Sequence, residues 1–293
     1  MQDLSCWLDV LGCPECRGPL RLEATDRLAC PTCGLDYPVV DQIPRLATAE
    51  VRRRLDAFAD EYRRRRLAEG WQPLSEADLL GLPEKEPPSP FPLYWPLRRE
   101  TWQIVRGRLI TAGPPPEAGP VADLGAGVGW LSYRLAQAGY RVVAVDASVD
   151  NAFGLAAARA YQAVAPFLAV QGDLERPPLR RGALSLVLFN ASLHYASDLV
   201  GTLRAAAAAL QPGGLLMVLD TPIAERPRRG TGHGDRHLGR RELDEALAAA
   251  GLTAQWVEIY RGPRWRLHQA VARLRGNDLF DFPLVMADKP RSP

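Results

Sequence analysis

The sequence predicts an α/β protein: a mostly parallel sheet, covered by helices on both faces and preceded by a small cysteine-rich domain. From residue 121 onward, short apolar runs alternate with helical segments, which is the pattern of parallel strands buried on both faces. The first of these runs leads directly into a glycine-rich turn, "VADLGAGVGW" at 121–130. All five cysteines lie within the first 33 of the 293 residues, which sets the N-terminal segment apart.

The bulk composition excludes membrane spans and indicates an ordinary folded protein. Hydrophobic residues make up 47% and charged residues 24% of the chain, and no apolar run approaches the roughly 20 residues that cross a bilayer. The first ten residues contain two acids and no basic n-region, so we expect no secretory signal and a cytoplasmic location. A net charge of only +2 provides no general attraction to nucleic acid.

The N-terminal domain, expected at residues 1–46, contains two Cys-Pro-x-Cys turns, each followed closely by a glycine. Such a cluster in a cytoplasmic chain indicates a metal site rather than disulfides. Two such turns direct four thiolates to one point, so we expect a closed tetrahedral zinc site with the ligands Cys13, Cys16, Cys30 and Cys33. A closed site leaves no position for a catalytic water, and the zinc is therefore expected to be structural. We expect Cys6 to be an idle thiol.

Residues 47–100 are expected to form an arginine-rich helix followed by a proline-rich linker. Apolar Val51, Leu55, Phe58 and Tyr62 recur every three or four residues, which predicts a helix at 50–69. Prolines then interrupt regular structure on both sides of a helix expected at 97–110. Nearby aromatic residues either cover a ligand or anchor this helix, and anchoring is favoured; they are Tyr94, Trp95 and Trp102.

The third domain, expected at 101–293, alternates strands with helices. We expect strands at 121–125, 141–147, 167–173, 183–190, 214–220, 253–260 and 279–287. We expect the intervening helices at 128–138, 150–165, 198–210, 240–252 and 265–275. This alternation predicts a doubly wound sheet, in which ligands bind at the carboxyl ends of the strands.

The glycine-rich turn after the first strand is the place where such sheets bind nucleosides. Dinucleotide enzymes use G-x-G-x-x-G there and set a pyrophosphate on the helix N-terminus. This chain instead has Gly125-x-Gly127-x-Gly129, with Asp123 two residues before the first glycine. A carboxylate at that position repels a pyrophosphate and attracts a cation. S-adenosylmethionine, which carries an ammonium, a sulfonium and no phosphate, therefore suits the turn.

Five motifs in order, over roughly residues 100–287, resemble those of class I S-adenosylmethionine-dependent methyltransferases. The motifs are "VADLGAGVGW", "VVAVDAS", "VQGDLERPPL", "LVLFNASLHYASD" and "ALQPGGLLMVLD". The resemblance implies a Rossmann-like, seven-stranded sheet, with Asp146 accepting hydrogen bonds from the ribose hydroxyls and Asp173 from the adenine amino group. The cofactor-binding residues that it implies are Asp123, Gly125, Ala126, Gly127, Asp146, Ala147, Asp173, Leu174 and Asn190.

The cysteine-rich segment "LGCPECRGPL…LACPTCGLDYPVVDQIPRL" resembles the small zinc ribbon that activates eukaryotic RNA and protein methyltransferases, and its bacterial single-domain relatives. The resemblance implies a possible partner protein bound through the ribbon. Bacterial rRNA guanine-N1 methyltransferases also carry a zinc ribbon before this catalytic domain. Their fourth zinc ligand is usually a histidine, whereas all four ligands are cysteines here. This difference weakens the assignment of their rRNA substrate to this chain.

The methyl acceptor is left open by the sequence. A base is needed only if the acceptor must lose a proton; His194 is the natural candidate, and packing beside the cofactor is its alternative role. The insert at 225–241, which includes six arginines, either clamps an anionic acceptor or is a solvated loop. A small molecule is slightly favoured as acceptor. The alternatives are methylation of an rRNA or tRNA base and a non-catalytic scaffold that holds cofactor without turnover.

Overall fold

The computed structural model describes residues 3–224, 237–275 and 279–291, and it confirms the expected seven-stranded sheet. The strand order is β11-β13-β9-β8-β5-β6-β7. The strands are β5 (Val121–Leu124), β6 (Val142–Asp146), β7 (Leu168–Gln171), β8 (Leu184–Asn190), β9 (Leu210–Leu219), β11 (Thr253–Val257) and β13 (Leu284–Asp288). The pairs from β7 to β9 are parallel, whereas β13 runs antiparallel to both neighbours.

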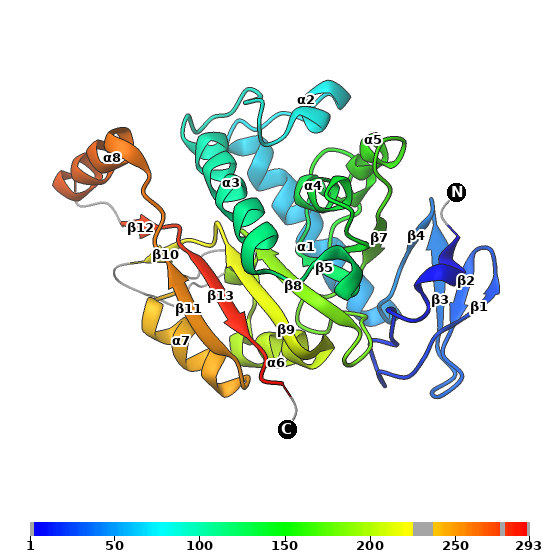
Figure 1. Cartoon of the computed structure of the whole chain (residues 1–293). Helices are drawn as coiled ribbons and strands as arrows, with labels where there is room; N and C mark the ends of the chain where they lie inside the picture. The colour runs from blue at the N-terminus through cyan, green and yellow to red at the C-terminus, as the bar shows by residue number, and fades with distance from the viewer. Residues whose placement is uncertain (1–2, 225–236, 276–278, 292–293) are drawn as a thin grey trace.

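Helices cover both faces of this sheet (Figure 1). They are α3 (Tyr94–Ala112), α4 (Trp130–Gln137), α5 (Arg159–Gln162), α6 (Leu199–Ala209) and α7 (Arg240–Ala249). Helix α8 (Gly262–Leu274) projects away from the sheet and has no buried residue. Alternate residues of each strand enter different cores, since Ala122 and Leu124 pack with α6 and α7, while Val121 packs with α3 and α4. None of the described helices has the length and apolarity needed to cross a membrane.

The cysteine-rich domain forms a four-stranded antiparallel sheet beside β7 (Figure 1). Its elements are η1 (Leu4–Trp7), β1 (Arg21–Ala24), β2 (Arg27–Ala29), β3 (Asp36–Val40) and β4 (Ile43–Pro44). The chain leaving β4 pairs with the edge of the large sheet, because the Leu46 amide donates to the Gln171 carbonyl at 2.9 Å. Leu11, Leu28 and other residues of this domain belong to the same apolar core as α6. The small domain therefore closes an open sheet edge.

The arginine-rich segment forms α1 (Ala49–Ala68), which confirms the helix expected at 50–69. Its arginines reach carboxylates in the loops that follow β7 and β6: Arg54 pairs with Asp173 at 2.7 Å and Arg63 with Asp150 at 3.1 Å. A short helix, α2 (Glu76–Gly81), follows within the segment expected to be a linker, and a capping box of Ser75 and Asp78 begins it. These contacts hold α1 against the carboxyl ends of the strands.

Two expectations for the large domain are wrong. The helix expected at 150–165 is reduced to η3 (Leu155–Ala158) and α5, because the Asp150 carboxylate accepts from the amides of Ala152 and Phe153 and holds them in a turn. The strand expected at 279–287 is divided into β12 (Phe280–Asp281) and β13, with Pro283, which has no N–H for a ladder, between them. Strand β12 pairs with the short β10 (Ile223–Ala224). Single 3-10 turns occur at η2 (Pro116–Ala118) and η4 (Leu193–Tyr195).

Candidate functional site

The glycine-rich turn connects β5 to α4 and forms one wall of a cavity at the carboxyl ends of β5, β6 and β8. Gly125, Gly127 and Gly129 have φ values of 75°, 56° and 81°, in the left-handed region that favours glycine. A Cβ on Gly125 would collide with the side chain of Ser192, whereas a Cβ on Gly127 would enter open space. The turn is thus packed on one side and leaves its backbone open to a ligand on the other.

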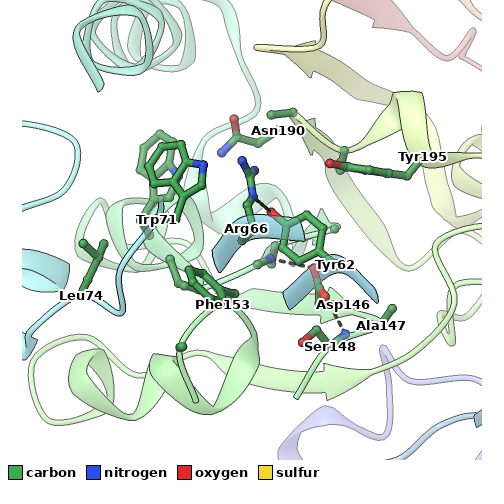
Figure 2. A pocket seen from close by; sticks show the side chains of 18 of the residues that line it. Tyr62, Arg66, Trp71, Leu74, Asp146, Ala147, Ser148, Phe153, Asn190 and Tyr195 are labelled. Atoms are coloured by element: carbon green, nitrogen blue, oxygen red, sulfur yellow. Dashed lines mark hydrogen bonds between the residues drawn. The ribbon is translucent and has the colours of Figure 1, made fainter. Parts of the chain in front are cut away.

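Seven of the predicted cofactor residues line this cavity together. They are Gly125, Ala126, Gly127, Asp146, Ala147, Leu174 and Asn190. Figure 2 shows Asp146, Ala147 and Asn190 around the same space, although the first two stand at the end of β6 and Asn190 ends β8. The parallel sheet brings them together because the carboxyl ends of its strands meet at one edge.

Asp146 and Asn190 have the chemistry that the polar part of S-adenosylmethionine requires. The Asp146 carboxylate accepts from the Gly127 amide at 2.8 Å and from the Ser148 amide at 2.7 Å, which fixes its orientation and leaves lone pairs for ribose hydroxyls. Burial raises the pKa of Asp146 to about 6, and the amides of Ser148 and Gly127 oppose this shift. The Asn190 Oδ1 is buried and has no hydrogen-bond partner among the described residues. These residues fit the cofactor.

Two other predicted cofactor residues do not line this cavity. Asp123 is fully buried in β5, where its Oδ2 accepts from the Ser132 hydroxyl at 2.8 Å. Burial raises the pKa of Asp123 to about 7, so this residue is not the cation-attracting carboxylate that the sequence predicts. Its bond to Ser132 instead ties β5 to α4. Asp173 lies in the loop after β7, and its carboxylate is engaged by Arg54 and the Glu175 amide. The two residues support the walls of the cavity.

The opposite wall comes from α1 and the segment after it, which sequence reasoning did not assign to the site. Phe58, Tyr62, Arg66 and Trp71 line the cavity, and Figure 2 shows three of them, Tyr62, Arg66 and Trp71, facing Asp146 across it. The Arg66 Nε donates to the Tyr62 hydroxyl at 2.9 Å, and its guanidinium lies 5.1 Å from the Trp71 ring centre. The apolar positions Phe58 and Tyr62 were visible in the sequence as a helix face, but the sequence did not show what the face covers.

The aromatic residues of α3 divide between the two roles considered for them. Tyr94 and Trp95 line the cavity. Trp102 is 3% exposed and packs in the core under α3. Trp95 is also buried in this core, so it both lines the cavity and anchors the helix, whereas Trp102 only anchors it.

A second cavity adjoins the first, between α3, α8 and β12. It shares Arg66, Tyr94, Arg98, Ala191 and Tyr195 with the first cavity. Its other walls are mainly apolar and aromatic, with Phe91, Pro92, Leu93, Leu97, Pro222, Trp265, Leu267, Val271, Phe280 and Phe282. A ligand in this cavity would thus lie next to a ligand in the first.

His194, the predicted base, lines the second cavity and not the first. Burial lowers the pKa of His194 to about 3, and the positive charges of Arg65 and Arg66 act in the same direction. The imidazole is therefore neutral at physiological pH and binds a proton weakly. Its Nδ1 has no hydrogen-bond partner among the described residues, which suits contact with a polar ligand group better than proton abstraction.

The four predicted zinc ligands converge in the small domain. All their sulfur atoms lie within 4.8 Å of one another, with Cys13 and Cys33 at 3.6 Å and Cys16 and Cys30 at 3.4 Å. A tetrahedral zinc ion with bonds of about 2.3 Å separates its sulfurs by about 3.8 Å. The Tyr37 hydroxyl lies 3.1 Å from the Cys13 sulfur and can donate to a thiolate ligand. The donor set fits one structural zinc ion.

The arginine-rich insert falls largely on residues 225–236, which lie outside the described residues. The role considered for the insert, that it binds an anionic methyl acceptor, therefore stays a prediction. His237, at its end, is described and packs edge-on against Phe280, with ring centres 4.7 Å apart.

Comparison with known proteins finds relatives for both the large domain and the cysteine-rich domain. Residues 122–218 match the family model of a methyltransferase domain, and residues 7–41 match that of the Trm112p-like proteins. A UPF0434 protein of Stutzerimonas stutzeri is 48% identical over 46 residues, which is 15% of this chain and 75% of the relative.

Solved structures of similar fold cover the large domain. A geranyl diphosphate methyltransferase, in complex with GPP and sinefungin, has a TM-score of 0.54 and 20% identity over 66% of this chain and 78% of its own. A complex of the Trm112 methyltransferase activator of Haloferax volcanii with its putative methyltransferase has a TM-score of 0.51 and 21% identity over 68% of this chain and 93% of that chain. At these identities the likeness shows a shared fold.

Proposed function

Because this chain is an S-adenosylmethionine-dependent methyltransferase whose N-terminal zinc ribbon belongs to the Trm112p-like UPF0434 family, we propose an acceptor for it: a largely apolar small molecule bound in the second cavity. When bound, S-adenosylmethionine supplies a methyl group already activated by its sulfonium. The protein then needs mainly to orient the acceptor and to exclude water. The seven cofactor residues that line the first cavity are proposed to hold the cofactor.

The observation that carries this proposal is the boundary between the two cavities. Tyr94, Arg98, Ala191 and Tyr195 line both, so a methyl group at the end of the first cavity faces the contents of the second. Aromatic and aliphatic walls that also carry a few placed polar groups are typical of small-molecule sites, and the polar groups of this cavity include His194, Asp220 and Arg264. Arg66 and Arg98 supply positive charge at the boundary, which favours an acceptor that also carries an anionic or electron-rich group.

The contacts of α1 weaken the RNA alternative. An RNA-binding helix presents unpaired arginines to phosphates. Arg54 and Arg63 are more than half exposed, but each is already paired with a carboxylate of the same chain, Asp173 and Asp150. Arg66 lies inside, against Tyr62 and Trp71. These three arginines are better explained as clamps on the cofactor cavity than as a nucleic-acid surface.

The zinc ribbon is proposed to act on its own catalytic domain. Its last strand leads into the pairing of Arg45 and Leu46 with Gln171, so the edge of β7 is occupied within the chain. A separate partner protein is not needed to cover this edge.

We also propose that the protein works in the cytoplasm.

The test is transfer of labelled methyl groups from S-adenosylmethionine to a cell extract divided into RNA, protein and low-molecular-weight fractions. We expect label in the low-molecular-weight fraction. The matched control is Asp146→Ala, which should label each fraction more slowly at limiting S-adenosylmethionine, because loss of the ribose contact weakens cofactor binding. Label confined to RNA would favour the base methyltransferase, and cofactor binding without label in any fraction would favour the scaffold.

A further inference from the structure

Asp220 is a buried carboxylate on the wall of the second cavity. It follows β9 directly, is 3% exposed, and lines the cavity together with Ala191 and His194. One of its two oxygens is engaged: Oδ1 accepts from the Thr101 hydroxyl at 2.6 Å and lies 3.8 Å from the Arg261 guanidinium. The other oxygen, Oδ2, is buried and has no hydrogen-bond partner among the described residues. A buried carboxylate oxygen without a partner is costly unless a ligand supplies the donor.

The position of Asp220 connects it to the cofactor cavity. In the register of β8 and β9, Asn190 pairs with Leu219, and the Ala191 amide donates to the Leu219 carbonyl at 2.8 Å. Asp220 is thus the neighbour, one strand across, of the two residues that line the cofactor cavity at the end of β8. Ala191 and Asp220 both have a φ of 51°. A left-handed conformation is uncommon for alanine and more accessible to aspartate, and non-glycine residues in this region are concentrated at functional sites.

Side chains around Asp220 fix its direction. Arg261, whose side chain is 1% exposed, donates to the carbonyls of Leu97 at 2.8 Å and Phe282 at 2.6 Å, and to the Thr101 hydroxyl at 2.9 Å. It therefore joins α3 to the segment between β12 and β13 and holds Oδ1 in place. This leaves Oδ2 as the oxygen free to meet a ligand.

We propose that Asp220 accepts, through Oδ2, the proton that the methyl acceptor loses, and that the acceptor therefore presents a hydroxyl or an amine at the boundary of the two cavities. The proposal rests on the proposed small-molecule acceptor. The acceptor's oxygen or nitrogen forms the new bond to the methyl carbon, and the carbon–sulfur bond breaks, leaving its electron pair on the neutral sulfur of S-adenosylhomocysteine. The O–H or N–H proton moves to Asp220, so charge and atoms balance.

The electrostatics favour Asp220 over His194 for this role. Burial raises the pKa of Asp220, while Arg98, the Thr101 hydroxyl and Arg261 oppose the shift. A carboxylate of raised pKa is a stronger base than an exposed one, whereas the pKa of His194 is about 3. The charged and titratable groups that surround Asp220 or share its cavity are Arg66, Tyr94, Arg98, Glu100, His194, Tyr195, Arg261, Arg264 and His268.

The test compares three variants in the labelled methyl assay, with the low-molecular-weight fraction of cell extract as the acceptor source. Asp220→Asn keeps an oxygen for the Thr101 hydroxyl and replaces Oδ2 by an amide that cannot take a proton. Thr101→Val removes the structural hydrogen bond and leaves the carboxylate. His194→Gln removes the imidazole. Binding of S-adenosylhomocysteine, measured by calorimetry, and the melting temperature report whether each variant is folded.

We expect Asp220→Asn to lose about 100-fold or more in turnover, with unchanged S-adenosylhomocysteine affinity. Wild-type turnover should fall as the pH drops and Asp220 becomes protonated, and the residual turnover of Asp220→Asn should lack this acid limb. Thr101→Val and His194→Gln should lose less than about 10-fold and keep the limb. Equal losses in Asp220→Asn and Thr101→Val with the same pH profile, or full turnover in Asp220→Asn, would overturn the role of Asp220. Label in RNA alone, or in no fraction, would instead overturn the small-molecule acceptor.

Discussion

Gln171 links the zinc ribbon, α1 and the cofactor cavity, and its replacement by leucine is the sharpest test of how these parts depend on one another. The side chain is 1% exposed at the end of β7. Its amide nitrogen donates to the Asp56 carboxylate at 2.9 Å and to the Ala147 carbonyl at 3.0 Å. Its oxygen accepts from Arg45 at 3.3 Å. Leucine is similar in size and makes none of these bonds.

The expected cost follows from these three contacts. A hydrogen bond to a neutral carbonyl contributes about 1 kcal/mol and one to a charged group about 1.5 kcal/mol or more, while the Arg45 bond is long and half-exposed and contributes little. We therefore expect Gln171→Leu to lower the free energy of unfolding by about 3 kcal/mol. Because Ala147 lines the cofactor cavity, loosening of its carbonyl should also weaken S-adenosylhomocysteine binding by about 1 kcal/mol, roughly fivefold.

Urea unfolding and calorimetric titration with S-adenosylhomocysteine measure the two effects. The matched control is Gln211→Leu, which removes a hydrogen bond to the Ala118 carbonyl at 3.2 Å, outside the residues that line the cofactor cavity. The control should cost about 1 kcal/mol of stability and leave cofactor affinity unchanged. Wild-type stability and affinity in Gln171→Leu, or an equal loss of affinity in Gln211→Leu, would refute the link.

Three further predictions concern the metal and two aspartates, Asp146 and Asp123. Purified protein should contain about one zinc per chain by elemental analysis, and a metal-free wild type would contradict the site. Cys30→Ser should lose the zinc and expose apolar surface that the small domain shares with the core of the large domain. Increased binding of a hydrophobic dye would detect this exposure. Asp146→Ala should weaken S-adenosylhomocysteine binding by about 1–3 kcal/mol, and unchanged affinity in calorimetry would mean that the ribose lies elsewhere. The pKa of Asp123 is raised to about 7 in the folded protein and is near 4 in the unfolded chain. The folded state therefore binds this proton more tightly. The unfolding free energy of the cofactor-free protein should rise as the pH falls from about 7 toward 4. Asp123→Asn should flatten this rise between pH 7.5 and 5.5 in urea unfolding, and an equally steep rise in the variant would exclude Asp123 as its source.

Local patterns were sufficient for the parallel strands, the glycine turn and the cluster of four cysteines. The spacing of Cys13, Cys16, Cys30 and Cys33 requires only two short turns to meet, and their sulfurs do meet. Asp146 and Asn190 each follow a buried strand, and parallel pairing alone brings the ends of such strands to one edge. These residues come together as expected because each expectation depends on a few neighbouring residues and on the general geometry of a doubly wound sheet.

The sequence by itself thus determined the fold class, the convergence of the four cysteines and one half of the cavity that is proposed to hold the cofactor. Only the tertiary structure decided the other half, since Tyr62, Arg66 and Trp71 reach it from a helix far away in the chain. Only the fold shows that Asp123 is buried behind the turn, bonded to Ser132, and that Asp220 keeps one oxygen without a partner beside the second cavity. The physical reason is that burial, and with it the pKa and the free hydrogen-bonding capacity of a carboxylate, is set by segments distant in sequence that pack around it.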